Sequence, residues 1–188
     1  MIDLAVAFRV VARALDEVGL PYVVVGSTAA AAWGVARGTR DVDVVTIIGE
    51  QGRDVGAALM DRLTDEDTYV PREDVAWALV HGGAFNVLHP GSGGKVDVFV
   101  RRADDEFTRS RLERRVPAEV LGVVTWVATP EDVILAKLRW RLGSRSEVQW
   151  RDCVEIAATQ TLDTEYLWAW APRLAVVDDL TELLSTDG

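Results

Sequence analysis

The sequence predicts an α/β fold, with a mixed, twisted sheet flanked by helices and followed by a C-terminal helical region. Short β-branched runs alternate with segments whose apolar residues follow helical spacing. A Gly-rich turn, PGSGG at 90–94, joins two apolar runs. From residue 129 the pattern is helical. We therefore predict an α/β core over residues 1–128 and a helical region over 129–188 that packs on it.

Local signals define the elements of the first third. Apolar residues from Leu4 onward follow helical spacing, and Gly19 and Pro21 end that helix. Ser27 is expected to be the N-cap of the next helix, because its hydroxyl accepts from a free backbone N–H. The expected elements are a helix at 3–18, a strand at 22–25, a helix from 27 to about 34–38, a strand at 41–48 and a helix at 52–63.

The remaining elements follow from turn and capping residues. Gly122 interrupts two strand-like runs, and Pro130 suits the first turn of a helix. Pro172 is expected to break the helical region. The predicted elements are a short helix at 73–79, a hairpin of 84–89 with 95–100, a helix at 103–114, strands within 116–128, a helix from 130 to about 142 and helices from 147 onward.

Composition excludes several classes of protein. The apolar fraction is 49%, yet no apolar run reaches the roughly 18 residues of a membrane span. Asp3 stands in the first turn and no basic segment precedes an apolar one, so no secretory signal is expected. Cys153 is the single cysteine, which rules out an internal disulfide. We therefore expect a cytoplasmic protein that has no membrane partner.

The formal net charge of −10 argues against a general polyanion-binding surface, because phosphate binding depends on Lys and Arg. A local basic patch stays compatible with it. The chain has 20 basic residues, and only Lys95 and Lys137 are lysines. The densest basic cluster spans Arg101 to Arg115, which we interpret either as a solvated helix face or as the place where an RNA acceptor lies.

Three acidic residues stand between apolar neighbours on predicted strands. Asp41 and Asp43 lie two residues apart, so their side chains project from the same face of a strand. Asp97 occupies a similar place in KVDVFV. Crowded carboxylates repel each other unless a cation lies between them or one is protonated. If the two strands are neighbours, the three acids outline a site for two Mg²⁺ ions, which prefer oxygen ligands.

Gly26 and Ser27 supply a second half of the pattern. Glycine allows close approach to the backbone, and a helix that begins at Ser27 presents free N–H groups to an anion. Arg37 and Arg40 precede the acid pair and suit further phosphate oxygens. Arg40 also suits a structural ion pair with Asp41 or another acid, and the sequence leaves both roles open.

The arrangement of Gly26-Ser27, thirteen residues and then Asp-Val-Asp resembles the signature of the polymerase-β-type nucleotidyltransferases. The wider string VVVGSTAAAAWGVARGTRDVDVV is similar to the minimal prokaryotic branch, which includes the abortive-infection toxins of the AbiEii type. The resemblance continues in KVDVFV and in TPEDVILAKLRWRLGSRSEVQWRDCVEI, where a Lys and a later Asp approach the active site. It covers roughly residues 20–158 and implies the nucleotidyltransferase fold.

The resemblance implies a role for each matching residue. Gly26 and Ser27 bind the triphosphate of a nucleoside triphosphate such as ATP, and Lys137 contacts it. Asp41 and Asp43 hold Mg²⁺, and Asp97 holds the second ion and helps to deprotonate an acceptor hydroxyl. A nucleoside monophosphate is transferred and pyrophosphate leaves. The acceptor is RNA such as tRNA, a protein or a small molecule such as an aminoglycoside, and a toxin-antitoxin role adds a cognate antitoxin as partner.

Alternative roles stay open for several of these residues. Lys95 suits a solvated hairpin position. Lys137 lies in an apolar helical stretch, from which a lysine also reaches water. Asp152 suits an exposed acid beside Arg151 as well as the resemblance. For the whole chain the alternative is a catalytically inactive member of the fold that binds a nucleotide or a protein partner, although the sequence retains all three acids.

Overall fold

A six-stranded mixed sheet forms the centre of the protein. The computed structural model describes residues 2–36, 38–49, 52–64 and 67–185. The strand order is β3-β4-β2-β1-β6-β5. The sheet confirms the predicted fold class. Its strands are β1 (Tyr22–Val25), β2 (Val42–Ile48), β3 (Gly83–His89), β4 (Gly94–Arg102), β5 (Val116–Val120) and β6 (Val123–Val127).

Strands β2 and β4 are parallel neighbours in the middle of this sheet, and their register aligns Asp43 with Asp97. On its other side β2 runs antiparallel to β1, where Val25 pairs with Asp43. Strand β1 is parallel to β6, and β3–β4 and β5–β6 are antiparallel hairpins. The turn at 90–94 therefore forms the predicted hairpin, and the strand after Gly26 returns beside the strand before it.

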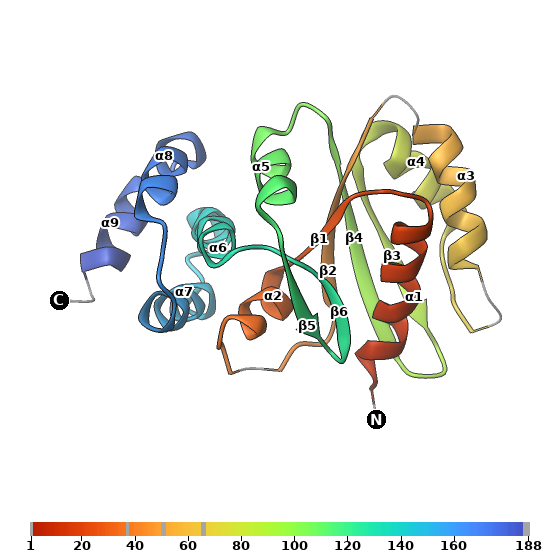
Figure 1. Cartoon of the computed structure of the whole chain (residues 1–188), viewed down its shortest axis with the longest axis horizontal. Helices are drawn as coiled ribbons and strands as arrows, with labels where there is room; N and C mark the ends of the chain where they lie inside the picture. The colour runs from red at the N-terminus through yellow and green to blue at the C-terminus, as the bar shows by residue number, and fades with distance from the viewer. Residues whose placement is uncertain (1, 37, 50–51, 65–66, 186–188) are drawn as a thin grey trace.

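Helices cover both faces of the sheet, and a group of further helices lies beyond it at one end of the molecule. Figure 1 shows α1 against the sheet, α3 and α4 at one end of the molecule, and α6 to α9 gathered at the opposite end. In the described part of the chain the helices are α1 (Leu4–Glu17), α2 (Gly26–Ala32), α3 (Gly52–Leu63), α4 (Arg72–His81), α5 (Glu106–Arg114), α6 (Pro130–Ser144), α7 (Glu147–Thr159), α8 (Thr164–Leu174) and α9 (Val177–Ser185).

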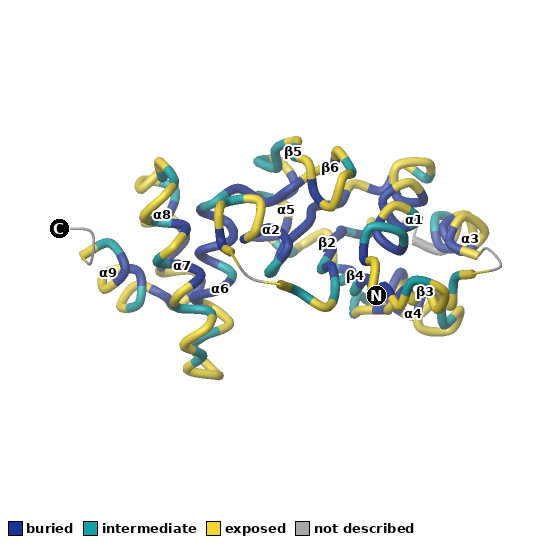
Figure 2. The backbone as a smooth tube through the Cα atoms, turned by 90° about the horizontal axis from the view of Figure 1, so that it is seen from below, coloured by how far each residue is buried: buried dark blue, intermediate teal, exposed yellow. Residues whose placement is uncertain are grey.

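The alternation of side chains along β2 and β4 separates a dry face from a polar one. Val44 and Val98 are fully buried on the face covered by α1. Gly94 shares this face, and a Cβ there would lie 3.0 Å from the Cβ of Ala7 in α1. Successive strand residues point to opposite faces, so Asp43 and Asp97 project from the other face. Figure 2 shows buried residues concentrated along the central strands and the inner turns of the helices.

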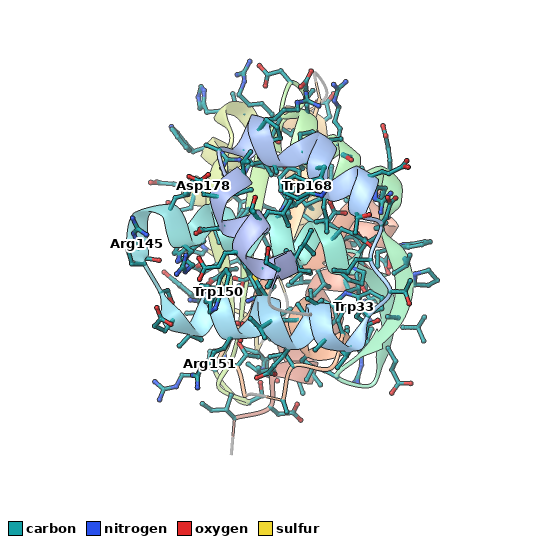
Figure 3. The ribbon with its side chains drawn as sticks, turned by 90° about the vertical axis from the view of Figure 1, so that its left-hand side faces the viewer. Trp33, Arg145, Trp150, Arg151, Trp168 and Asp178 are labelled. Atoms are coloured by element: carbon teal, nitrogen blue, oxygen red, sulfur yellow. The ribbon has the colours of Figure 1, made fainter. Side chains whose placement is uncertain are left out.

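The C-terminal helices are joined to the core at Trp33, which follows α2. Its indole Nε1 donates to the Ala128 carbonyl at 2.8 Å. Thr159 Oγ1 and Gln160 Nε2, at the end of α7, both donate to the Trp33 carbonyl. Figure 3, which looks onto this end of the molecule, places Trp33 beside α7. Helix α6 begins where expected, with Thr129 as N-cap and Pro130 at its first position. The boundary between residues 128 and 129 as a domain limit stays a prediction.

Two local expectations are wrong. Helix α2 begins at Gly26 with Val25 in the N-cap position, and no side chain caps it, so Ser27 is not the N-cap. Gly26 has φ +65°, which lets the chain turn from β1 directly into the helix. Helix α8 continues through Pro172 to Leu174, so the break between α8 and α9 comes at 175–176 and not at the proline itself. No helix in the described ranges is both long and apolar enough to cross a membrane.

Candidate active site

The three predicted acids lie together on the polar face of the sheet. Asp41 immediately precedes β2, Asp43 is the second residue of β2, and Asp97 is its register partner on β4. All three side chains are half-buried. The expected adjacency of the two strands is therefore present, and it places three carboxylates side by side at the ends where β2 and β4 begin.

The crowding of these carboxylates changes the acidity of Asp43. The pKa of Asp43 is raised from 3.8 to about 6, first by burial and then by the negative charges of Asp41 and Asp97. The ammonium groups of Lys95 and Lys137 offset part of this rise. Asp43 is consequently the acid whose ionisation the surroundings disfavour most clearly, and a cation beside it would relieve that cost.

Lys95 lies within the acid cluster, which corrects the expectation of a solvated hairpin residue. Its Nζ is 2.8 Å from Asp97 Oδ2 and 3.8 Å from Asp41 Oδ2. The hydrogen bond to Asp97 is the main reason why the pKa of Lys95 is raised. Lys95 and Asp97 are two residues apart on β4, so both side chains project from the same face.

Gly26 makes room for the Asp43 carboxylate. A Cβ built on Gly26 would lie 2.1 Å from Asp43 Oδ2 and 3.0 Å from its Cγ, far inside contact distance. Together with the positive φ, this close approach explains why glycine occupies position 26. Ser27 follows at the wall of the adjoining cleft. The Gly-Ser pair and the acids are therefore one continuous structure.

A cleft of about 680 Å³ opens beside the acid cluster. Asp43 lies at its edge, and helices α5 and α6 contribute walls on either side. Its size suits a nucleotide or a compound of similar dimensions. The lining residues are Val25, Gly26, Ser27, Asp43, Val45, Phe99, Arg101, Asp105, Phe107, Arg111, Ala128, Asp132, Val133, Ala136, Lys137, Arg139, Trp140 and Gln149.

Lys137 lies in the wall of this cleft and forms a buried ion pair with Asp152. Its Nζ is 2.6 Å from Asp152 Oδ2 and donates to Gln149 Oε1 at 3.0 Å. The two charged side chains are only 5% and 3% exposed. Asp152 is thus not an exposed acid beside Arg151, which points away from the helices in Figure 3. The pair joins α6 to α7 and holds the ammonium near Asp43.

The two arginines expected at the phosphates lie elsewhere or outside the described residues. Arg37 falls outside the described ranges. Arg40 is exposed and does not line the cleft. Within the described ranges its side chain forms no ion pair with Asp41 or Asp43, so the structural pairing considered for Arg40 is absent there.

The basic cluster at 101–115 is mostly engaged in contacts within the protein. The Arg111 guanidinium is buried, donates to Thr108 Oγ1 and lies 4.6 Å from the Phe107 ring. Arg114 pairs with Glu131 and packs on Tyr166, and Arg115 packs on Trp126. The cluster is therefore not one solvated face. Arg101 and Arg111 reach the cleft instead.

Sequence patterns missed several residues of the site. Lys95 could have been found from its spacing of two residues from Asp97, which puts both on one face of a strand. Gln149 and the cleft residues Arg111 and Arg139 carried no such signal, because they come from three different helices. Their proximity depends on how α5, α6 and α7 pack.

The acid cluster suits a hard divalent cation in its chemistry. Asp97 Oδ1 is buried and has no hydrogen-bond partner among the described residues, which leaves a carboxylate oxygen available as a ligand. As it stands, no group of three acidic, imidazole or thiol side chains in the described residues is arranged to hold a metal ion. The Lys95 ammonium lies between Asp41 and Asp97 in this arrangement.

Comparison with solved structures identifies the fold. An antigenic nucleotidyltransferase-like protein from Paracoccidioides brasiliensis has a TM-score of 0.60 at 19% identity, over 97% of this chain and 92% of that one. The antibiotic-resistance factor ANT(2″)-Ia has a TM-score of 0.57 at 15% identity, over 95% and 96%. The same factor in complex with adenylyl-2″-tobramycin has a TM-score of 0.55 at 16% identity, over 91% and 96%.

The chain therefore has the nucleotidyltransferase fold, as these three structures of similar length do. Identities below 20% establish the fold alone. No protein-family model matches the sequence, and no curated protein sequence matches it significantly.

Replacing Gly26 by alanine tests the close approach to Asp43. We expect Gly26→Ala to lose about 1–2 kcal/mol of stability from the left-handed backbone alone, and to displace the Asp43 carboxylate as well. Gly143→Ala is the matched control, since Gly143 lies in α6 with no atom within 4 Å of an added Cβ. That control should be neutral or stabilising by up to about 1 kcal/mol. Chemical denaturation of both variants measures their free energies of unfolding. Equal values would contradict the close approach of the Asp43 carboxylate to Gly26.

Removing one partner of the buried Lys137–Asp152 pair tests its role. Asp152→Ala strands an ammonium among apolar residues, so we expect a loss of about 3–5 kcal/mol. Glu155→Ala changes an exposed acid of the same helix and should stay within about 0.5 kcal/mol of the wild type. Denaturant titration of both variants gives the comparison. A small effect of Asp152→Ala would mean that the Lys137 ammonium reaches water.

Proposed function

We propose that the protein is a Mg²⁺-dependent nucleotidyltransferase, which moves a nucleoside monophosphate from a nucleoside triphosphate to an acceptor hydroxyl. The observation that supports this most is the meeting of three carboxylates with Gly26 at the edge of a nucleotide-sized cleft. Burial, and then the neighbouring charges of Asp41 and Asp97, raise the pKa of Asp43, and perturbed pKa values of this kind cluster at functional sites. The fold adds to this support, because it is the fold of known nucleotidyltransferases.

The proposed roles follow from position. Asp41, Asp43 and Asp97 would hold two Mg²⁺ ions, which stabilise the attacking and leaving oxygens when bound. The backbone at Gly26 and Ser27 receives the triphosphate. Lys137 donates two of its three protons to Asp152 and Gln149, which leaves the third for a phosphate oxygen.

The transfer forms one bond and breaks one bond. The acceptor oxygen bonds to the α-phosphorus while the bond from that phosphorus to the bridging oxygen breaks, and pyrophosphate leaves. Asp97 helps to take up the hydroxyl proton, because its carboxylate is the register partner of Asp43 within the acid cluster. Trp140 and Phe99 offer apolar surface in the cleft for a base or for the acceptor.

The acceptor and the biological role are finer parts of the same proposal. ANT(2″)-Ia has been crystallised with adenylyl-2″-tobramycin, and that supports a small-molecule hydroxyl as one acceptor class. The resemblance to AbiEii-type toxins supports tRNA or protein, with a cognate antitoxin. Incubation with each α-labelled nucleoside triphosphate, Mg²⁺ and a cell extract, followed by separation of RNA, protein and small molecules, distinguishes these classes.

Nucleotidyl transfer is expected to require the acids of the cluster. Asp43→Asn keeps the shape of the side chain but removes a charged ligand, so label transfer should fall by at least about a hundredfold. Calorimetry with ATP, GTP, CTP and UTP in the presence of Mg²⁺ should show binding of at least one nucleotide by the wild type. Binding without transfer to any fraction would favour the inactive nucleotide-binding alternative, and absence of both from folded protein would contradict both functions.

Stability without metal provides a second test with a defined pH dependence. The folded-state pKa of Asp43, about 6, lies above its unfolded value, so its protonation stabilises the fold below about pH 4 and this contribution is lost as pH rises through 6. At pH 7–8 the ionised group therefore costs about 1–2 kcal/mol after solvent screening. Metal-free Asp43→Asn should melt about 2–8 °C above the wild type there.

The difference in melting temperature should shrink towards pH 4, where Asp43 is protonated in the folded state. Added Mg²⁺ should stabilise the wild type more than the variant, because the variant lacks a ligand. A metal-free variant that melts well below the wild type and still transfers label would identify Asp43 as a structural residue.

A further inference from the structure

Lys95 provides a cation inside the acid cluster. The ammonium lies 2.8 Å from Asp97 Oδ2 and 3.8 Å from Asp41 Oδ2, and the side chain is only 36% exposed. This placement follows from the backbone, since Lys95 precedes Asp97 by two residues on β4 and pairs with Leu88 of β3. The hairpin therefore holds the ammonium beside these carboxylates.

The charges of the cluster favour one resident divalent cation. Three ionised carboxylates and the Lys95 ammonium leave two net negative charges, which one divalent cation balances. Lys137 adds less than Lys95 to this balance, because Asp152 lies 2.6 Å from its ammonium and offsets its charge. A second divalent cation would give an excess of positive charge until an anionic ligand such as a triphosphate arrives.

The remaining carboxylate oxygens indicate where a cation would bind. The Lys95 ammonium engages Oδ2 of Asp97 and Oδ2 of Asp41. Asp97 Oδ1 is buried and unpartnered among the described residues, and the Asp43 carboxylate lies on the adjacent strand above Gly26. One side of the cluster therefore has an internal cation, and the other side has a free oxygen donor.

We propose that Lys95 is a resident counter-cation of the acid cluster, which lowers its affinity for divalent cations and restricts the nucleotide-free protein to one such ion. This inference rests on the proposed function, because it treats the same acids as metal ligands. A bound nucleoside triphosphate supplies the negative charge that makes a second ion favourable. Because of Lys95, the second cation site is occupied only when a nucleotide is bound.

Mn²⁺ binding to the nucleotide-free protein tests this role without any measurement of activity. Electron paramagnetic resonance of free Mn²⁺ during a titration gives the number of ions and their affinity. The wild type should bind one ion. Lys95→Met should bind at least about tenfold more tightly or take a second ion, because it removes a like charge within about 4 Å of the ligands. Lys95→Arg should behave like the wild type.

Arg40→Gln is the matched control. It removes the same unit charge beside Asp41, but its side chain is exposed and makes no ion pair with the described acids of the cluster. Its Mn²⁺ affinity should stay within about twofold of the wild type, since exposed charges are screened. An equal gain in affinity in Arg40→Gln and Lys95→Met would overturn the proposal, because the overall field rather than the position of Lys95 would then be responsible.

Further outcomes separate this inference from the function on which it rests. Equal or weaker Mn²⁺ binding by Lys95→Met overturns the role of Lys95 and leaves nucleotidyl transfer intact. Absence of Mn²⁺ binding by both proteins overturns the role of Lys95 and the metal dependence together.

Melting curves test whether the variants fold. Lys95→Met and Lys95→Gln should be less stable than the wild type without Mn²⁺ and regain stability with it. Failure of both variants to fold with Mn²⁺ would make Lys95 structural and overturn the proposal.

Discussion

The candidate site depends on the parallel pairing of β2 and β4, whose register aligns Asp43 with Asp97. Side chains on directly paired residues of neighbouring strands project from one face, so this register brings the two carboxylates together. A slip of one residue would turn one of them into the dry face under α1. The buried valines on that face, such as Val44 and Val98, oppose such a slip because they would then face the cleft.

Close placement of like charges carries a cost that neighbouring residues reduce in different ways. Gly26 admits the Asp43 carboxylate against the backbone, where any side chain would collide with it. Lys95 adds a positive charge between Asp41 and Asp97. Even so, burial and the charges of Asp41 and Asp97 raise the pKa of Asp43.

The helical end completes the cleft and connects its chemistry to stability. Asp152 and Gln149 of α7 hold the Lys137 ammonium in the wall of the cleft. Trp33 joins the end of α7 to the core through its indole and its carbonyl. The orientation of α6 and α7 relative to the sheet therefore fixes how far Lys137 lies from the acids.

The sequence by itself determined the order of helices and strands, the hairpin at 90–94 and the three acids, because these depend on local periodicity, turn residues and charges between apolar neighbours. It misplaced the start of α2, where the positive φ of Gly26 replaces a capping side chain. Only the tertiary structure decided the neighbours of β2, the position of the Lys95 ammonium, the Lys137–Asp152 pair and the internal contacts of Arg111 and Arg114. The pairing of β2 with β4 and the packing of Arg114 on Tyr166 join segments distant in sequence, so register and packing select them after local propensities have been satisfied.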